Sequence, residues 1–428
     1  MKTLIGTNVS ILTSDIISRN MEKIKIENLS LVFGKNRSKA IDLLKKGQGK
    51  SEILEKTGCT VAVRDANLTI NEGEIFVIMG LSGSGKSTLL RCLNRLINPT
   101  IGKIFINKDD ITNMSDKELL EIRRKELAMV FQHFGLLPHR TVLSNVAFGL
   151  ELQGISKEER ETRAMETIEL VDLKGYENQK VSELSGGMQQ RVGLARGLAN
   201  NPEVLLMDEA FSALDPLIRS QMQDELLLLQ EKMQKTIVFI THDLDEAIKL
   251  GDRIAIMKDG EIVQVGTSEE IITNPANDYV TSFVENVDRS KVVTAGSIMF
   301  TKPTIARLKK DGPAVVVRKM REKGLSSLPV VRTNRTFLGF INIEDAVNLK
   351  KKEIKSIEEA IKPEAMTVTA EATVEDILPL LSKTTRSIPV VNEENHLLGT
   401  VSQTSVIAEM TGKDKDEISD IIQKAYDL

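Results

Sequence analysis

Apolar and polar positions alternate from residue 21 to 33 (MEKIKIENLSLVF), the period-two pattern of a strand with one buried face. Three later runs are apolar almost throughout and end in polar or turn-forming residues: 74–80 (EIFVIMG), 203–210 (EVLLMDEA) and 236–243 (TIVFITHD). Such runs are typical of parallel strands buried on both faces. Residues 220–235 (SQMQDELLLLQEKMQK) separate the last two runs and have helical length and polar flanks. The pattern from 21 to about 285 therefore predicts an α/β fold.

Beyond residue 290 the pattern changes and repeats. The segment from 326 (SSLPVVRTNRTFLGFI) matches the segment from 386 (RSIPVVNEENHLLGTV). Pro329 and Pro389 lie 60 residues apart, and so do Gly339 and Gly399. A constant offset predicts two copies of one small module, each using the other to bury its sheet.

The length of 428 residues exceeds one ordinary domain, and a composition of 28% charged and 41% hydrophobic residues is that of a globular protein. The net charge of −4 gives no signature of a nucleic-acid polymer as partner. Cys59 and Cys92 form no metal or disulfide framework, which favours a reducing compartment. Apolar runs stay below the ~18–20 residues of a membrane span. We therefore expect a soluble intracellular protein whose residues 1–20 form a loosely ordered leader.

The segment 80–88 (GLSGSGKST) fits the phosphate-loop pattern GxxxxGK[ST] between an expected strand and an expected helix. Its glycines let backbone N–H groups surround phosphate oxygens, and the helix start adds its positive dipole end. Lys86 is expected to reach the β- and γ-phosphates, and the Ser87 hydroxyl to ligate Mg²⁺. The residues expected to contact the nucleotide are Gly80, Ser82, Gly83, Ser84, Gly85, Lys86, Ser87 and Thr88.

Polar residues follow the other apolar strands. Asp208 ends one of them and can hold Mg²⁺, while Glu209 beside it can polarise an attacking water. His242 closes the next strand at the same carboxyl edge, where α/β folds bind ligands. Gln132 can likewise reach the metal and the water. Acidic residues at strand ends are often only solvated, and a lone histidine is usually structural. The expected roles of Asp208 and Glu209 therefore depend on the phosphate loop in the same α/β unit, and that of His242 depends on its position at a strand end.

A second glycine-rich helix start, LSGGMQQR, occupies 184–191. A bared helix start is another anion site, and two such sites can enclose a polyanion between them.

Together these motifs resemble the ATP-binding cassette (ABC) ATPases: GLSGSGKS, Gln132, LSGGMQQR, VLLMDE, SALD at 212–215, and His242. The resemblance implies a P-loop NTPase cassette that binds ATP and Mg²⁺ in a head-to-tail dimer with a second copy of the chain. It assigns Glu209 as general base, His242 as a γ-phosphate contact, and Gln132 as metal sensor and link to a membrane partner. Further roles that it implies are contacts to the partner's ATP by Ser185, Gly186, Gly187 and Gln189, dimer communication by Asp215, and adenine stacking by Phe33.

The long charged segment 34–60 and the tail 266–287 (GTSEEIITNPANDYVTSFVENV) resemble the ATPase subunits of bacterial glycine betaine/proline importers. The resemblance implies separate transmembrane permease subunits with a substrate-binding protein or domain. It implies a peripheral position on the cytoplasmic side of the cell membrane. The cassette is expected to span 21–285, with a plausibly helical insert at 34–60 and a helical subdomain at about 133–195.

The repeat resembles a tandem pair of cystathionine-β-synthase (CBS) domains, at 294–350 and 354–412, after a linker at 286–293 and before an acidic tail at 413–428. Such pairs often hold adenine nucleotides, and here the ligand could be AMP, ATP, a cyclic dinucleotide or none. The first copy keeps Asp345 of the family's ribose-phosphate motif but has Asn342 in place of its hydroxyl. The second copy keeps the hydroxyl as Ser402 and loses the acid at Ser405.

An alternative role for the first copy is electrostatic. Lys350, Lys351 and Lys352 belong to basic runs that can attract an anionic membrane surface, an attraction that salt screens over about 8–10 Å. A run of charged residues is more often an ordinary solvent-exposed surface than a membrane-binding one.

The sequence leaves three alternatives to an ATPase of a glycine betaine/proline importer. The cassette could serve another small solute, such as an amino acid or another quaternary amine. It could act on DNA or ribosomes, although no coiled-coil insertion or second cassette is present in the sequence. It could be a silent regulatory subunit, which the intact Lys86, Asp208, Glu209 and His242 disfavour.

Overall fold

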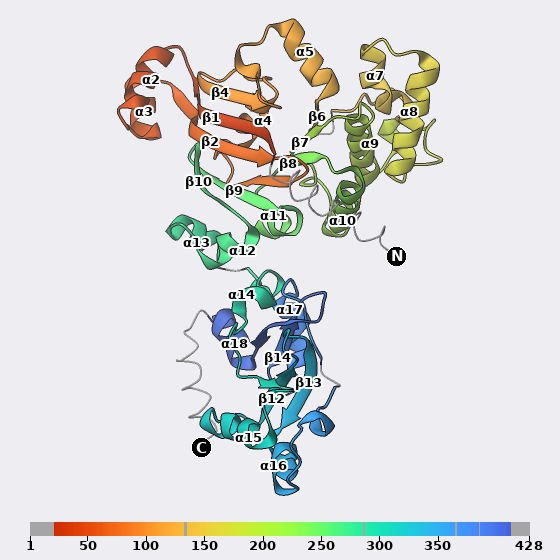
Figure 1. Cartoon of the computed structure of the whole chain (residues 1–428). Coiled ribbons are helices and arrows are strands. Elements are labelled where there is room, and N and C mark those ends of the chain that lie inside the picture. The colour runs from red at the N-terminus through yellow and green to blue at the C-terminus, as the bar shows by residue number, and fades with distance from the viewer. Residues whose placement is uncertain (1–20, 132–134, 286, 364–365, 385, 412–428) are drawn as a thin grey trace. The chain divides into compact units, whose positions relative to one another are not determined.

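The computed structural model describes residues 21–131, 135–285, 287–363, 366–384 and 386–411. The chain divides after Val287 into two compact units, an N-terminal and a C-terminal one (Figure 1). The expected leader 1–20 and tail 413–428 lie outside the described residues.

The N-terminal unit contains two sheets, one of four strands and one of six. The first has the order β2-β1-β4-β5 and its neighbours are antiparallel. The second has the order β10-β9-β3-β8-β7-β6, in which only β10 runs antiparallel to its neighbour. The strands are β1 (Glu22–Phe33), β2 (Thr60–Asn71), β3 (Ile75–Met79), β4 (Ile101–Ile106), β5 (Asp109–Asp110), β6 (Leu127–Val130), β7 (Val204–Asp208), β8 (Thr236–Thr241), β9 (Arg253–Lys258) and β10 (Glu261–Gly266).

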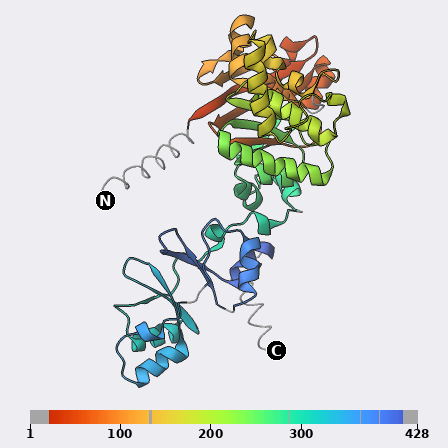
Figure 2. The same cartoon turned by 90° about the vertical axis from the view of Figure 1, so that its right-hand side faces the viewer.

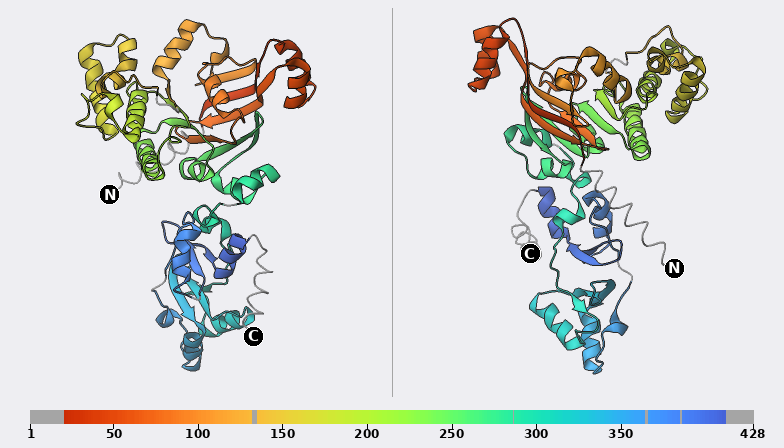
Figure 3. Two further views of the ribbon diagram at one scale, coloured as in Figure 1. Left: turned by 180° about the vertical axis from the view of Figure 1, so that it is seen from behind. Right: turned by 45° about the horizontal axis from the view of Figure 1, so that its top comes forward.

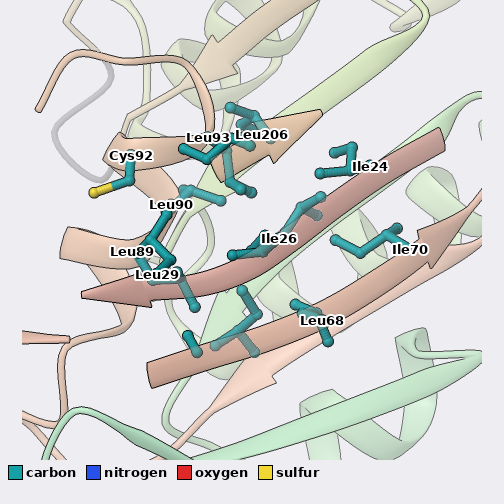
Figure 4. Packing of buried hydrophobic residues seen from close by; sticks show 14 of the residues in the cluster. Ile24, Ile26, Leu29, Leu68, Ile70, Leu89, Leu90, Cys92, Leu93 and Leu206 are labelled. Carbon is teal, nitrogen blue, oxygen red and sulfur yellow. The ribbon is translucent and has the colours of Figure 1, made fainter. Parts of the chain in front are cut away.

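The three apolar runs form the centre of the six-stranded sheet. Every residue of β3, β7 and β8 is buried, as expected for parallel strands covered on both faces. Helix α4 (Lys86–Leu93) follows β3 and shares one core with both sheets. Figure 4 shows Leu89 and Leu90 of α4 among the buried side chains around Ile26 of β1. This core fixes the start of α4, and with it the phosphate loop.

The remaining helices of this unit lie around the sheets. They are α2 (Arg37–Lys45), α3 (Lys50–Thr57), α5 (Asp116–Lys125), α6 (Val142–Val146), α7 (Phe148–Leu152), α8 (Lys157–Leu170), α9 (Gly186–Leu198), α10 (Pro216–Met233), α11 (Leu244–Leu250), α12 (Ser268–Thr273) and α13 (Asp278–Val284). Helices α7, α8 and α9 group together at one side of the cassette (Figure 1). Helices α2 and α3 connect β1 with β2 and stand beyond the ends of these strands (Figure 3).

The C-terminal unit repeats one hairpin. Its elements are α14 (Ala295–Ile298), β11 (Ala306–Arg307), α15 (Pro313–Glu322), β12 (Ser327–Val331), β13 (Phe337–Asn342), α16 (Ile343–Lys351), α17 (Val374–Leu381), β14 (Ile388–Val391), β15 (Leu397–Val401) and α18 (Gln403–Thr411). Val330 pairs with Gly339 in the first copy as Val390 pairs with Gly399 in the second. Figure 2 shows the strands of both copies.

The two copies contact each other, as the repeat predicts. Phe337 N–H donates to the Asn395 carbonyl at 2.9 Å, and Leu397 N–H donates to the Arg335 carbonyl at 3.0 Å. One buried apolar cluster draws on both copies: Val331, Phe337, Phe340, Val391 and Leu397. Each copy therefore covers apolar surface of the other.

Among the described residues, no helix combines the length and the apolar character needed to cross a membrane.

Candidate ATP site

The phosphate loop turns between β3 and α4 with backbone angles that suit glycine. Gly80 and Gly85 have φ angles of 149° and 103°. A Cβ on Gly80 would collide with the Met257 carbonyl of β9, and a Cβ on Gly85 with the Ala62 carbonyl of β2. Glycine is therefore required at both positions, and the loop packs directly on two neighbouring strands.

Lys86 is the first residue of α4 and contacts this loop. Its Nζ donates to the carbonyls of Gly80 at 2.8 Å and Leu81 at 3.1 Å, and stands 4.0 Å from Glu209 Oε1. Burial lowers the pKa of Lys86, while the Glu209 and Asp208 carboxylates act in the opposite direction. The ammonium is thus held between the carbonyls of the phosphate loop and the Glu209 carboxylate.

Asp208 ends β7 and accepts two hydrogen bonds at once. Ser87 Oγ donates to Oδ1 at 2.7 Å, and Arg91 donates to Oδ2 at 3.1 Å. The hydroxyl and the carboxylate are adjacent oxygen ligands of the kind Mg²⁺ prefers, so these residues fit the metal. The sequence analysis did not identify Arg91 as a partner of Asp208, although Arg91 lies four residues after Ser87 and therefore on the same helix face.

Glu209 follows with a left-handed backbone, at φ 46°, which is unusual for a residue with a side chain. Ser212 stabilises this turn, because its backbone N–H and its hydroxyl both donate to the Glu209 carbonyl. Glu209 Oε1 lies 3.7 Å from His242 Nδ1, and His242 follows β8. The two strand ends therefore bring Glu209, His242 and Lys86 together.

A pocket of about 420 Å³ opens beside the loop. The residues that line it include Phe33, Lys50, Ser82, Thr88 and Glu209. Phe33 is 41% exposed, which leaves its ring accessible to a base. The sequence reading missed Lys50, the first residue of α3, because the length of an insert does not show where it folds.

The sequence analysis also expects Ser84 and Gln132 at this site. Ser84 is buried and does not line it, and its hydroxyl has no hydrogen-bond partner among the described residues. Gln132 lies outside the described residues.

The second glycine-rich segment starts α9. Ser185 caps this helix by accepting from Met188 N–H at 3.4 Å, and Ser185 and Gly186 are exposed. Gly187 faces Ile218 of α10 closely. The Gln189 amide donates to the carbonyls of Val181 and Leu184, so it supports the preceding turn of its own chain.

These signature residues do not line the pocket beside their own phosphate loop. Asp215 is likewise exposed, and it caps α10 through Ile218 N–H at 3.1 Å.

In the C-terminal unit, Ser402 lines a cleft of about 540 Å³ together with Lys302, Lys323 and Arg386. Asp345 does not line this cleft and instead forms an ion pair with Lys362 at 2.9 Å. The structure thus separates the two residues of the divided ribose-phosphate motif. Lys350, Lys351 and Lys352 are exposed at the end of α16.

Family models match two regions of the chain. Residues 63–212 match the ABC transporter model, and residues 295–352 and 354–412 match the CBS domain model.

Relatives cover nearly the whole chain. It is 54% identical to the glycine betaine/carnitine transport ATP-binding protein GbuA of Listeria monocytogenes, over 92% of this chain and 99% of that protein. It is 52% identical to the glycine betaine transport ATP-binding protein OpuAA of Bacillus subtilis, over 92% and 93% of the two chains. A solved structure, CbiO1 of Clostridium perfringens, part of an ABC transporter complex, aligns with a TM-score of 0.50 and 25% identity over 60% of this chain and 93% of that one.

The stretch that matches the ABC transporter model contains the phosphate loop, the start of the signature helix and the acidic strand end, and the two relatives align along about nine-tenths of the chain. This chain belongs to the family of ABC transporter ATP-binding proteins and carries a tandem pair of CBS domains.

Proposed function

We propose that this chain is the ATP-hydrolysing subunit of an importer for glycine betaine and related osmoprotectants. It works with separate transmembrane permease subunits and with a substrate-binding protein or domain. It occupies a peripheral position on the cytoplasmic side of the cell membrane. The observation that carries the substrate class is the 54% identity to a glycine betaine/carnitine transport protein along nearly the whole of both chains.

In the proposed mechanism the loop amides and Lys86 hold the β- and γ-phosphates, and Phe33 stacks on the adenine. Ser87 and Asp208 hold Mg²⁺, which neutralises charge on the phosphate oxygens when it is bound. Glu209 accepts the proton of the water that attacks the γ-phosphorus, and His242 contacts the γ-phosphate. The 3.7 Å separation of Glu209 and His242 supports this division of roles.

A second copy of the chain completes the site. Ser185 and Gly186 are exposed at the start of α9 and do not line the pocket of their own chain. In a head-to-tail dimer, Ser185, Gly186 and Gly187 contact the partner's γ-phosphate, and the exposed Asp215 lies at the dimer contact. Gln189 contributes by supporting the turn that presents Ser185.

The CBS pair regulates the ATPase. The cleft beside Ser402 is lined by three cationic side chains, Lys302, Lys323 and Arg386, which suits an anionic ligand such as an adenine nucleotide or a cyclic dinucleotide. The exposed Lys350, Lys351 and Lys352 provide a surface for anionic lipid, which responds to ionic strength.

The test uses the complex of this chain with its membrane partner, placed in lipid vesicles. We expect ATP-driven uptake of radiolabelled glycine betaine, and we expect excess unlabelled carnitine to compete with it. Glu209→Gln should lower turnover at least 100-fold while ATP still binds, because the variant cannot accept the proton of the attacking water.

This test distinguishes an error in the substrate class from an error in the assignment of Glu209 as the base. An ATPase-competent complex that takes up no glycine betaine would refute the substrate class. A Glu209→Gln complex that hydrolyses ATP at the normal rate would refute the assignment of the base.

A further inference from the structure

The side chain of Gln264 in β10 forms two hydrogen bonds with the segment that follows this strand. Gln264 Nε2 donates to the Asn274 carbonyl at 3.0 Å, and Gln264 Oε1 accepts from Ala276 N–H at 2.8 Å. Asn277 then caps α13 by accepting from Val280 N–H at 3.1 Å. These contacts fix the start of α13, the last helix before the C-terminal unit begins at Asp288.

Tyr279 projects from the first turn of α13 and is half-buried. Its hydroxyl donates to the Met257 carbonyl of β9 at 3.3 Å. Its ring is held by Phe283, edge to face at 5.1 Å between centroids, and by Lys258, whose Nζ stands 4.5 Å from the ring centre. Burial raises the pKa of Tyr279, and the backbone of Leu81 in the phosphate loop acts against that rise.

Met257, to which Tyr279 donates, is itself part of the support of the phosphate loop. The Met257 carbonyl occupies the space where a side chain on Gly80 would lie. The turn after β9 makes a second contact, because Gly260 N–H donates to the Ser84 carbonyl at 2.9 Å. The backbone of the phosphate loop therefore rests on β9 and its turn, and α13 is attached at the same place.

We propose that Tyr279 is a positioning residue for ATP binding, which ties α13 to the support of the phosphate loop through the Met257 carbonyl of β9. The hydroxyl holds the Met257 carbonyl, against which Gly80 of the loop packs, and Gln264 keeps α13 in place to present that hydroxyl. Because α13 is the last helix before the regulatory unit, this contact is the point at which the proposed regulation can reach the nucleotide.

The test compares Tyr279→Phe with Tyr176→Phe in the full-length chain. Both variants lose one hydroxyl, but Tyr176 lies after α8 and does not line the ATP pocket. ATP affinity is measured by displacement of a fluorescent ATP analogue. We expect Tyr279→Phe to weaken ATP binding about three- to tenfold, the loss of one hydrogen bond, and Tyr176→Phe to leave it unchanged. In the vesicle complex, the KM for ATP should rise while kcat at saturating ATP stays within about twofold.

Gln264→Ala provides a second variant, which frees the start of α13 without touching the phosphate loop. If Gln264 acts through Tyr279, the double variant should bind ATP no more weakly than Tyr279→Phe alone. Unchanged ATP affinity in Tyr279→Phe, a loss of kcat without a change in KM, or additive effects of the two substitutions would each overturn the proposal.

The regulatory part of this inference rests on the proposed function, but the affinity test does not. A complex that failed to transport glycine betaine would refute the proposed substrate, and the ATP displacement measurement would still decide the role of Tyr279.

Discussion

Two glycines of the N-terminal unit have similar backbone angles and different surroundings. Gly85 has a φ of 103° and a backbone carbonyl, that of Ala62, where its Cβ would be. Gly58 ends α3 with a φ of 68°, and nothing lies within 4 Å of its Cβ position. Gly85 is required both because another residue would be strained at its φ angle and because a Cβ would collide with backbone. Gly58 is required only because of its φ angle.

We therefore expect Gly58→Ala to lower the free energy of unfolding by about 1–2 kcal/mol, the cost of a left-handed alanine. Gly85→Ala should cost about 3 kcal/mol or more, because the strain adds to a collision with rigid backbone. Urea unfolding of the two full-length variants measures both losses. Equal losses would show that the contact between the phosphate loop and β2 has little energetic weight.

The motif residues along the phosphate loop and the acidic strand could be predicted from sequence because each belongs to a short local pattern. Arg91 and Lys50 could not, since their roles depend on which residues the fold brings near Asp208 and Phe33. The divided roles of Asp345 and Ser402 show the same limit. The sequence shows that each copy keeps a different residue of one motif, but only the fold shows that Asp345 forms an ion pair while Ser402 lines a cleft.

Helices α2 and α3 form an element with a small core of its own. The buried residues of this core are Val32, Ala40, Ile53, Cys59 and Val61. The core holds α3 so that Lys50, its first residue, lines the ATP pocket. The insert is thus part of the wall of the ATP site, as well as a link between β1 and β2.

From this arrangement we expect Lys50→Ala to weaken ATP binding about two- to fivefold at low salt, because one cation near a polyanion is lost. Screening should reduce the difference at high ionic strength. Lys46→Ala serves as the control, since Lys46 follows α2 directly and is exposed. Equal effects of the two substitutions would mean that only net charge matters, and would remove Lys50 from the site.

Helix α15 is held by one buried carboxylate. Burial alone would raise the pKa of Asp311, but hydrogen bonds from the Lys319 ammonium at 2.6 Å and the Arg307 N–H at 2.8 Å outweigh it and lower the pKa. A carboxyl whose pKa is lower in the folded chain stabilises the fold above its unfolded pKa. That contribution is lost as the pH falls through the folded value.

Asp311→Asn should therefore destabilise the C-terminal unit by about 1 kcal/mol or more at pH 7. The difference from the unaltered chain should shrink below about pH 4, where the carboxyl is protonated when unfolded. Hydrogen exchange of residues 306–331 in the full-length chain measures it at each pH. A difference that stayed constant down to pH 3 would show that the ionised carboxylate does not stabilise α15.

At the scale of the whole molecule, a net charge of −4 conceals an uneven distribution. The last turn of α16 carries Lys350 and Lys351, with Lys352 following, and all three are exposed. A local cluster of cations is attracted to anionic lipid whatever the sign of the total charge, and the attraction weakens as the Debye length shortens to about 8–10 Å.

Under the proposed function, this attraction is the physical route by which internal salt would activate the importer. If the cluster holds the complex inactive on the membrane at low salt, changing Lys350, Lys351 and Lys352 to Gln removes about three charges, each contributing about 1 kcal/mol of attraction. Uptake of glycine betaine into vesicles with anionic lipid should then become activated at a lower salt concentration. The matched control changes Lys35, Lys45 and Lys46 to Gln, which removes the same charge from exposed positions at the insert. If both triple variants shift the activation curve equally, the total charge is the cause, and if neither does, the sensor lies elsewhere than the end of α16.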